Sequence, residues 1–173
     1  MNTLIVYCTS HGTTTKAAIS LKKQLDGEVI VLNLNQAKLH SDIELFDSVI
    51  IGGSIRVGRI QGKIKKFIKQ HEENLYDKKI GLFLCCMRDG EVAEEQFEGA
   101  FPMSLRERAI AKGLFGGEFL FSKMNFFERQ IVTKISGMSA DISLIDEYAI
   151  KEFANCFNNK EVSGLEREIP VLT

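Results

Sequence analysis

The sequence has little of what marks several common classes of protein. Its 173 residues include no tryptophan, two prolines and four cysteines, and the cysteines show no CxxC spacing. No apolar run approaches the roughly 18 residues that cross a bilayer, and the N-terminus enters a strand pattern without a secretory leader. The formal net charge of −1 gives no global field for nucleic acid, so we expect no nucleic-acid partner. These absences favour a reduced, cytoplasmic protein.

Short apolar runs alternate with helical patterns along the chain, and this alternation predicts an α/β fold. Continuous runs such as residues 3–8 are typical of parallel strands that are buried on both faces. The pattern therefore predicts a doubly wound, five-stranded parallel sheet in one domain, residues 1–158, followed by a polar tail, residues 159–173. The predicted strands are residues 3–8, 28–32, 48–53, 79–87 and 113–121, and the predicted helices are residues 16–25, 60–74, 124–136 and 142–157, with another from about 104.

A hydroxyl-rich loop follows the first predicted strand. A phosphate needs backbone N–H groups, short hydroxyls and a helix N-terminus, and a loop with one glycine before a helix supplies all three. Because the loop lacks the Gly-Lys-Ser/Thr element and GxGxxG is absent, it is neither a P-loop nor a dinucleotide fingerprint. On its own the loop suits an anion site or a capped helix that binds nothing. Its candidate phosphate-binding residues are Thr9, Ser10, His11, Gly12, Thr13 and Thr14.

Two further loops are predicted at the same edge of the sheet, because ligands of doubly wound sheets bind beyond the carboxyl ends of the strands. The second runs from the third strand and contains Gly53, Ser54, Ile55, Arg56, Val57 and Gly58. The third, after the fourth strand, contains Cys86, Met87 and Arg88. We interpret the neighbouring cysteines, 85 and 86, as small buried residues rather than a redox pair, and we expect no internal disulfide.

With its three loops placed, the chain resembles the flavodoxin superfamily. More closely, it is similar to the flavodoxin-domain family that includes menaquinone-dependent protoporphyrinogen IX dehydrogenase. The resemblance rests on the 9–15 loop, on Gly52-Gly53-Ser54-Ile55-Arg56-Val57-Gly58, and on Lys134-Ile135-Ser136-Gly137 with Asp141 following. It implies a strand order of 2-1-3-4-5, an extra helix after the fifth strand, and FMN as cofactor in the three loops. It also implies oxidation of a reduced substrate such as protoporphyrinogen, with electrons passed to a quinone.

Two other functions stay open beside the dehydrogenase. A flavodoxin that carries electrons between protein partners would use the same cofactor, and a non-redox module could keep the fold without flavin. The sequence identifies no catalytic residue and no metal site, and it leaves the oligomeric state open.

Charge and apolar surface are unevenly distributed along the predicted helices. The predicted helix 60–74 has a basic side, and the segment 91–98 is acidic. The predicted helix 124–136 has a broad apolar side that includes Phe126 and Phe127. This helix suits either packing on the domain or a peripheral contact with the inner face of the cell membrane.

Overall fold

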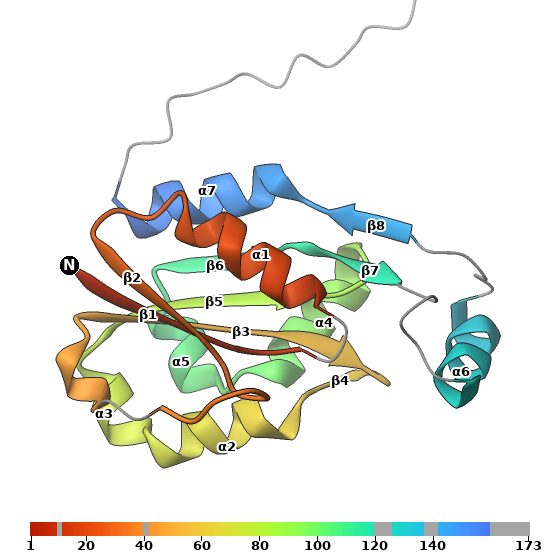
Figure 1. The fold of residues 1–173 in the computed structure, drawn as a ribbon, viewed down its shortest axis with the longest axis horizontal. Coiled ribbons are helices and arrows are strands. Elements are labelled where there is room, and N and C mark those ends of the chain that lie inside the picture. The colour runs from red at the N-terminus through yellow and green to blue at the C-terminus, as the bar shows by residue number, and fades with distance from the viewer. Residues whose placement is uncertain (10–11, 40–41, 120–125, 137–141, 160–173) are drawn as a thin grey trace, which may run out of the picture.

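A single parallel sheet organises the chain. The computed structural model describes residues 1–9, 12–39, 42–119, 126–136 and 142–159 (Figure 1). Its main strands are β1 (Asn2–Cys8), β2 (Glu28–Asn33), β3 (Ser48–Arg56), β5 (Lys79–Cys85) and β6 (Ala111–Leu114), in the order β2-β1-β3-β5-β6. A short strand, β4 (Arg59–Ile60), pairs antiparallel with the end of β3. With β4 set aside, the predicted order 2-1-3-4-5 is confirmed.

Helices cover both faces of this sheet, which is why its strands are continuously apolar. On one face lie α1 (Thr13–Lys22) and α7 (Glu147–Phe157), and on the other lie α2 (Gly62–Gln70), α3 (Glu72–Tyr76), α4 (Gly90–Ala100) and α5 (Met103–Arg108) (Figure 1). Leu4, Ile5 and Val6 are all fully buried, although successive side chains of a strand point to opposite faces. The strands therefore hold two cores, one on each side of the sheet.

The helical pattern of residues 60–74 forms two helices instead of one. α2 ends at Gln70, and α3 begins at Glu72 after His71. The apolar positions Ile64, Phe67 and Ile68 are buried, so the predicted inward face is correct. The single helix was wrong because the pattern carries no signal for the break at His71. At the first loop, α1 begins at Thr13, three residues before the predicted start at 16.

The predicted fifth strand and last helix are both wrong in their bounds. The predicted strand 113–121 is divided between β6 and β7 (Gly116–Phe119), because Gly116, with a φ of 67°, turns the chain after the buried Phe115. Residues 120 and 121 lie outside the described residues. β7 then pairs antiparallel with β8 (Ile142–Ile145), which the sequence assigned to the last helix. α7 begins only after Asp146, whose carboxylate accepts a hydrogen bond from the Ala149 N–H.

Three smaller segments complete the described chain. The residues between β5 and α5, left unassigned by the sequence, form α4, and a 3-10 turn spans Ile43–Leu45. The extra helix is α6 (Phe126–Ser136), where Phe126 and Phe127 are 70% and 77% exposed. Those two rings do not pack on the domain. None of the helices in the described part of the chain has the length and hydrophobicity of a membrane span.

Candidate functional site

The three predicted loops meet at one edge of the sheet, where parallel strands place their carboxyl ends. Cys8, the last residue of β1, lies opposite Gly53 of β3, and Ser54 lies opposite Cys85, the last residue of β5. The structure thus brings Thr9, Ser54 and Cys86 to neighbouring positions. Ser10 and His11 lie outside the described residues.

The first loop closes over the N-terminus of α1. Gly12 caps the helix with a φ of 99°, a left-handed conformation that glycine adopts at low cost. Its N–H donates to the Thr9 hydroxyl over 3.2 Å. The first N–H groups of an α-helix have no partner within the helix, and glycine has no side chain to cap them. A Cβ at Gly12 would meet no atom within 4 Å, so the backbone faces open space.

The Thr14 hydroxyl is buried without a hydrogen bond. The residue is fully buried, and its Oγ1 finds no partner among the described residues. Leaving a buried hydroxyl unpaired costs ~1–3 kcal/mol, so folded proteins rarely do so. Together with the N–H groups of the first turn of α1, which no N-cap side chain covers, this hydroxyl makes the loop a site that fits a phosphate oxygen. The chemistry of the donors fits an FMN phosphate, which accepts hydrogen bonds from neutral N–H and O–H groups.

Asn35, which the sequence analysis missed, holds the first loop from the neighbouring strand end. Its side-chain amide donates to the Thr9 carbonyl over 2.6 Å, and its own N–H donates to the Asn33 side chain over 3.0 Å. From the other side, the Tyr7 hydroxyl donates to the Thr15 hydroxyl over 3.1 Å. Nothing in the sequence around Asn35 indicates this role, because the role depends on β2 lying beside β1.

The second loop is the tip of a β-hairpin. β3 continues through Arg56, so Gly53, Ser54, Ile55 and Arg56 belong to a strand rather than to the loop that the sequence predicted. Val57 and Gly58 alone form the turn, with φ values of 50° and 74°. Positive φ at both central residues is the signature of a type I′ turn, which favours Asn-Gly. Val57 is 73% exposed there, in a conformation that a β-branched residue rarely adopts.

Gln61, also missed by the sequence, clamps this hairpin at its base. Its amide nitrogen donates to the Ser54 hydroxyl over 2.7 Å, and its amide oxygen accepts from the Ser54 N–H over 3.3 Å. The glycines of β3 have internal neighbours as well. A Cβ at Gly53 would lie 2.8 Å from Ile60, and one at Gly52 would lie 2.0 Å from the buried Phe83 ring. Ser54 is therefore fixed by groups of the chain itself.

The third loop is supported by β7. Cys86 is buried and donates from its thiol to the Arg88 carbonyl over 3.5 Å, whereas Arg88 is exposed. A Cβ at Gly117 would lie 2.9 Å from both the Cys86 backbone and the Met87 sulfur. The bend at Gly116 thus lays β7 against the start of the third loop.

The pKa of each of the two thiols at the site, Cys8 and Cys86, is raised. Burial raises the pKa of Cys8, although Lys63 and Asn35 oppose the shift. Burial also raises the pKa of Cys86, against a hydrogen bond with the Arg88 backbone. Because thiolates are the nucleophilic form, neither group has the lowered pKa of a catalytic cysteine. None of the four cysteines, all of which lie within the described residues, takes part in a disulfide.

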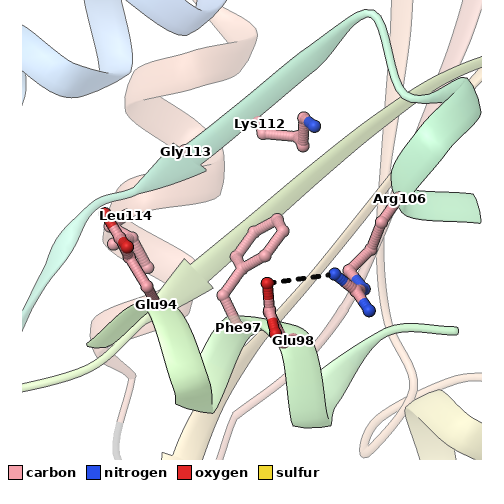
Figure 2. Close-up of a pocket in the computed structure, with 7 residues that line it drawn as sticks. All are labelled: Glu94, Phe97, Glu98, Arg106, Lys112, Gly113 and Leu114. Carbon is pink, nitrogen blue, oxygen red and sulfur yellow. Dashed lines mark ion pairs between the residues drawn. The ribbon is translucent and has the colours of Figure 1, made fainter. Parts of the chain in front are cut away.

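A cavity of about 420 Å³ lies between α4, α5 and the edge strand β6 (Figure 2). Glu94, Phe97 and Glu98 of α4 form one wall, and an ion pair of 3.4 Å joins Glu98 to Arg106 of α5 (Figure 2). The rest of the lining is Lys112, Gly113 and Leu114 of β6. None of the predicted site residues lines it. No group of three or more histidine, cysteine or acidic residues within the described chain could hold a metal ion.

The fold and the three loops define a flavodoxin-like α/β protein. The chain belongs to the flavodoxin domain family, whose model matches residues 4–143. No curated protein matches the chain significantly.

Solved flavodoxins share the fold at low sequence identity. Flavodoxin 1 from Bacillus cereus is similar over 92% of this chain and 98% of its own, with a TM-score of 0.57 and 17% identity. A short-chain flavodoxin associated with a bacterial microcompartment gives a TM-score of 0.58 with 14% identity, over 92% of this chain and 97% of its own. A Fusobacterium nucleatum flavodoxin bound to flavin mononucleotide is 22% identical, with a TM-score of 0.42 over 49% of this chain, which spans 52% of that flavodoxin's length.

Proposed function

We propose that the protein binds FMN in the three loops and transfers electrons with it. The observation that carries this proposal is the first loop, where the buried Thr14 hydroxyl, at the N-terminus of α1, has no partner among the described residues. Membership of the flavodoxin domain family supports the same cofactor. When bound, FMN supplies the capacity to accept and release electrons, and the protein contributes binding and electrostatics.

Different loops would bind different parts of the cofactor. Thr13, Thr14 and the N–H groups of the first turn of α1 would bind the phosphate, and Gly12 leaves room for its approach. Ser54 to Gly58 and Cys86 to Arg88 would border the isoalloxazine ring from the ends of β3 and β5. We assign the phosphate to neutral donors because the stretch from Thr9 to Thr15 has no lysine or arginine.

Titration of the flavin-free protein with FMN tests this proposal. We expect saturable quenching of flavin fluorescence with one FMN per chain, and visible absorbance that bleaches on reduction with dithionite. Absence of saturable binding would contradict the proposal.

A second candidate is the FMN-dependent dehydrogenase that oxidises protoporphyrinogen IX and reduces a quinone. The stretch from Ser54 to Gly58 and the end of the extra helix near Lys134 favour it through their resemblance to that family. Its peripheral membrane version would use the exposed rings of Phe126 and Phe127. Anaerobic turnover with protoporphyrinogen and a menaquinone analogue tests it, with no acceptor as control. Two-electron reduction of the protein by protoporphyrinogen would select this candidate, and no rate above background would remove it.

A further inference from the structure

One segment beside the candidate flavin site is positively charged without interruption. Between Ser48 and His71 the sequence has no acidic residue. The basic residues of this stretch are exposed, and they lie at the hairpin tip and along α2: Arg56, Arg59, Lys63, Lys65, Lys66 and Lys69. We call this set the basic ridge. It leads from the second loop, at the edge that holds the site, down the outer side of α2.

The basic ridge places like charges next to each other, which is unfavourable for stability. Arg56 and Arg59 are cross-strand partners, and like charges placed directly opposite are destabilising. On α2, Lys65 and Lys69 are four residues apart, a spacing at which like charges also repel. Between the two arginines, Val57 is exposed at a positive φ. Local rules broken together in one segment are expected at functional sites.

A face of opposite charge lies beside the ridge. α4 contacts β4 and covers the same side of the sheet as α2 (Figure 1). Its charged residues are all acidic: Glu91, Glu94, Glu95 and Glu98, each exposed. Although the net charge of the chain is close to zero, its positive and negative charges are separated here, on the basic ridge and on α4.

We propose that the basic ridge is the docking surface for a redox partner protein that presents an acidic patch. This inference rests on the proposed electron-transfer function, because the ridge begins at the second loop. Charge complementarity would steer the partner to the loops, and the exposed Val57 would be the apolar contact at the centre of the encounter.

The neighbouring helix favours a protein over a uniformly anionic surface. A membrane or a nucleic acid carries negative charge across its whole face, so an approach to the ridge would also press the four carboxylates of α4 against like charge. A protein can match the ridge with acidic residues and leave α4 facing solvent or a basic group. The carboxylates of α4 thus repel a membrane or a nucleic acid and disfavour both as partners of the ridge.

Electron transfer with a small acidic redox protein tests the inference. The probe is a reduced plant-type [2Fe–2S] ferredoxin, mixed with the FMN-loaded protein in a stopped-flow instrument at low and high salt. In Lys65→Glu/Lys66→Glu we expect the second-order rate at low salt to fall by about tenfold, and the loss to shrink below about twofold near ~0.5 M salt. Glu91→Lys/Glu95→Lys should raise the rate.

Lys22→Glu/Lys23→Glu is the matched control, because it makes the same charge change at the end of α1, on the opposite face. It should change the rate by less than about threefold. Equal rates for the ridge variant and this control would overturn the inference, whereas a failure to bind FMN at all would overturn the proposed function. Sedimentation with phosphatidylglycerol vesicles completes the test. We expect no binding, and binding that the ridge variant abolishes would assign the ridge to a membrane instead.

Discussion

The first and second loops meet at one edge of the sheet, yet they differ in how their polar groups are satisfied. In the first loop, the Thr14 hydroxyl finds no partner among the described residues, no side chain at Gly12 caps α1, and Gly12 faces open space. In the second, Ser54 is bonded twice to Gln61, and the space beside Gly53 is filled by Ile60. The first loop is therefore incomplete without a ligand, whereas the second is complete and directs its charge outward.

The largest difference in stability should appear when Gly12, in the first loop, or Gly52, on β3 before the second loop, is replaced by alanine. Gly52→Ala places a methyl group inside the buried Phe83 ring, and we expect a loss of ~3 kcal/mol in the free energy of unfolding. Gly12→Ala meets no atom and pays only for its left-handed backbone, ~1 kcal/mol. Urea denaturation measures both, with Gly62→Ala as a control that has open space and ordinary φ. Equal losses at residues 52 and 12 would remove the contrast.

Breaking the clamp should cost less than filling the strand. Gln61→Met keeps the length of the side chain but removes both bonds to Ser54, and we expect a loss of ~1–2 kcal/mol. The Ser54 amide should also exchange its hydrogen faster with solvent. Gln70→Met, at the exposed far end of α2, is the control and should be neutral. If both variants unfold alike, the clamp contributes nothing.

Removing the backbone strain at Val57 should stabilise the turn of the second loop. Val57→Gly suits a positive φ, and we expect a gain of ~1 kcal/mol in the free energy of unfolding. Val57→Ala removes the β-branch but keeps a Cβ, so its gain should be smaller. Thermal unfolding of the three proteins measures the series, and a loss of stability in Val57→Gly would show that the valine is not strained.

The smallest effect should come from the thiols that begin the first and third loops. Burial raises the pKa of both Cys8 and Cys86, so the unfolded chain gives up these protons first as pH rises. Stability from these groups is present below the ordinary thiol pKa and falls as pH rises above it. Iodoacetamide should label the exposed Cys156 well before either of them, as mass spectrometry of timed samples would show. Early labelling of Cys86 would mean that it is a reactive thiolate.

The sequence predicted the sheet but not the groups that complete its edge. The alternation of helices with apolar strands such as residues 3–8 was sufficient to predict the sheet. Strands that are buried on both faces can be recognised in a sequence as continuous apolar runs. The break at Gly116 and the strand at Ile142–Ile145 were missed, since short apolar runs suit helix and strand alike. Asn35 and Gln61 lie in polar connections, and only the pairing of distant strands gives them a role.

The incomplete first loop is the central claim, and comparison of FMN with riboflavin tests it most directly, since riboflavin has the ring without the phosphate. We expect the protein to bind FMN at least ~100-fold more tightly than riboflavin, because hydrogen bonds to a charged group are each worth ~1.5–3 kcal/mol. Thr14→Val should lose about tenfold in FMN affinity, leave riboflavin unchanged and melt no lower without flavin, since it removes an unpaired buried hydroxyl. Thr133→Val on α6 is the control. Equal affinity for the two flavins, or full FMN affinity in Thr14→Val, would contradict the account.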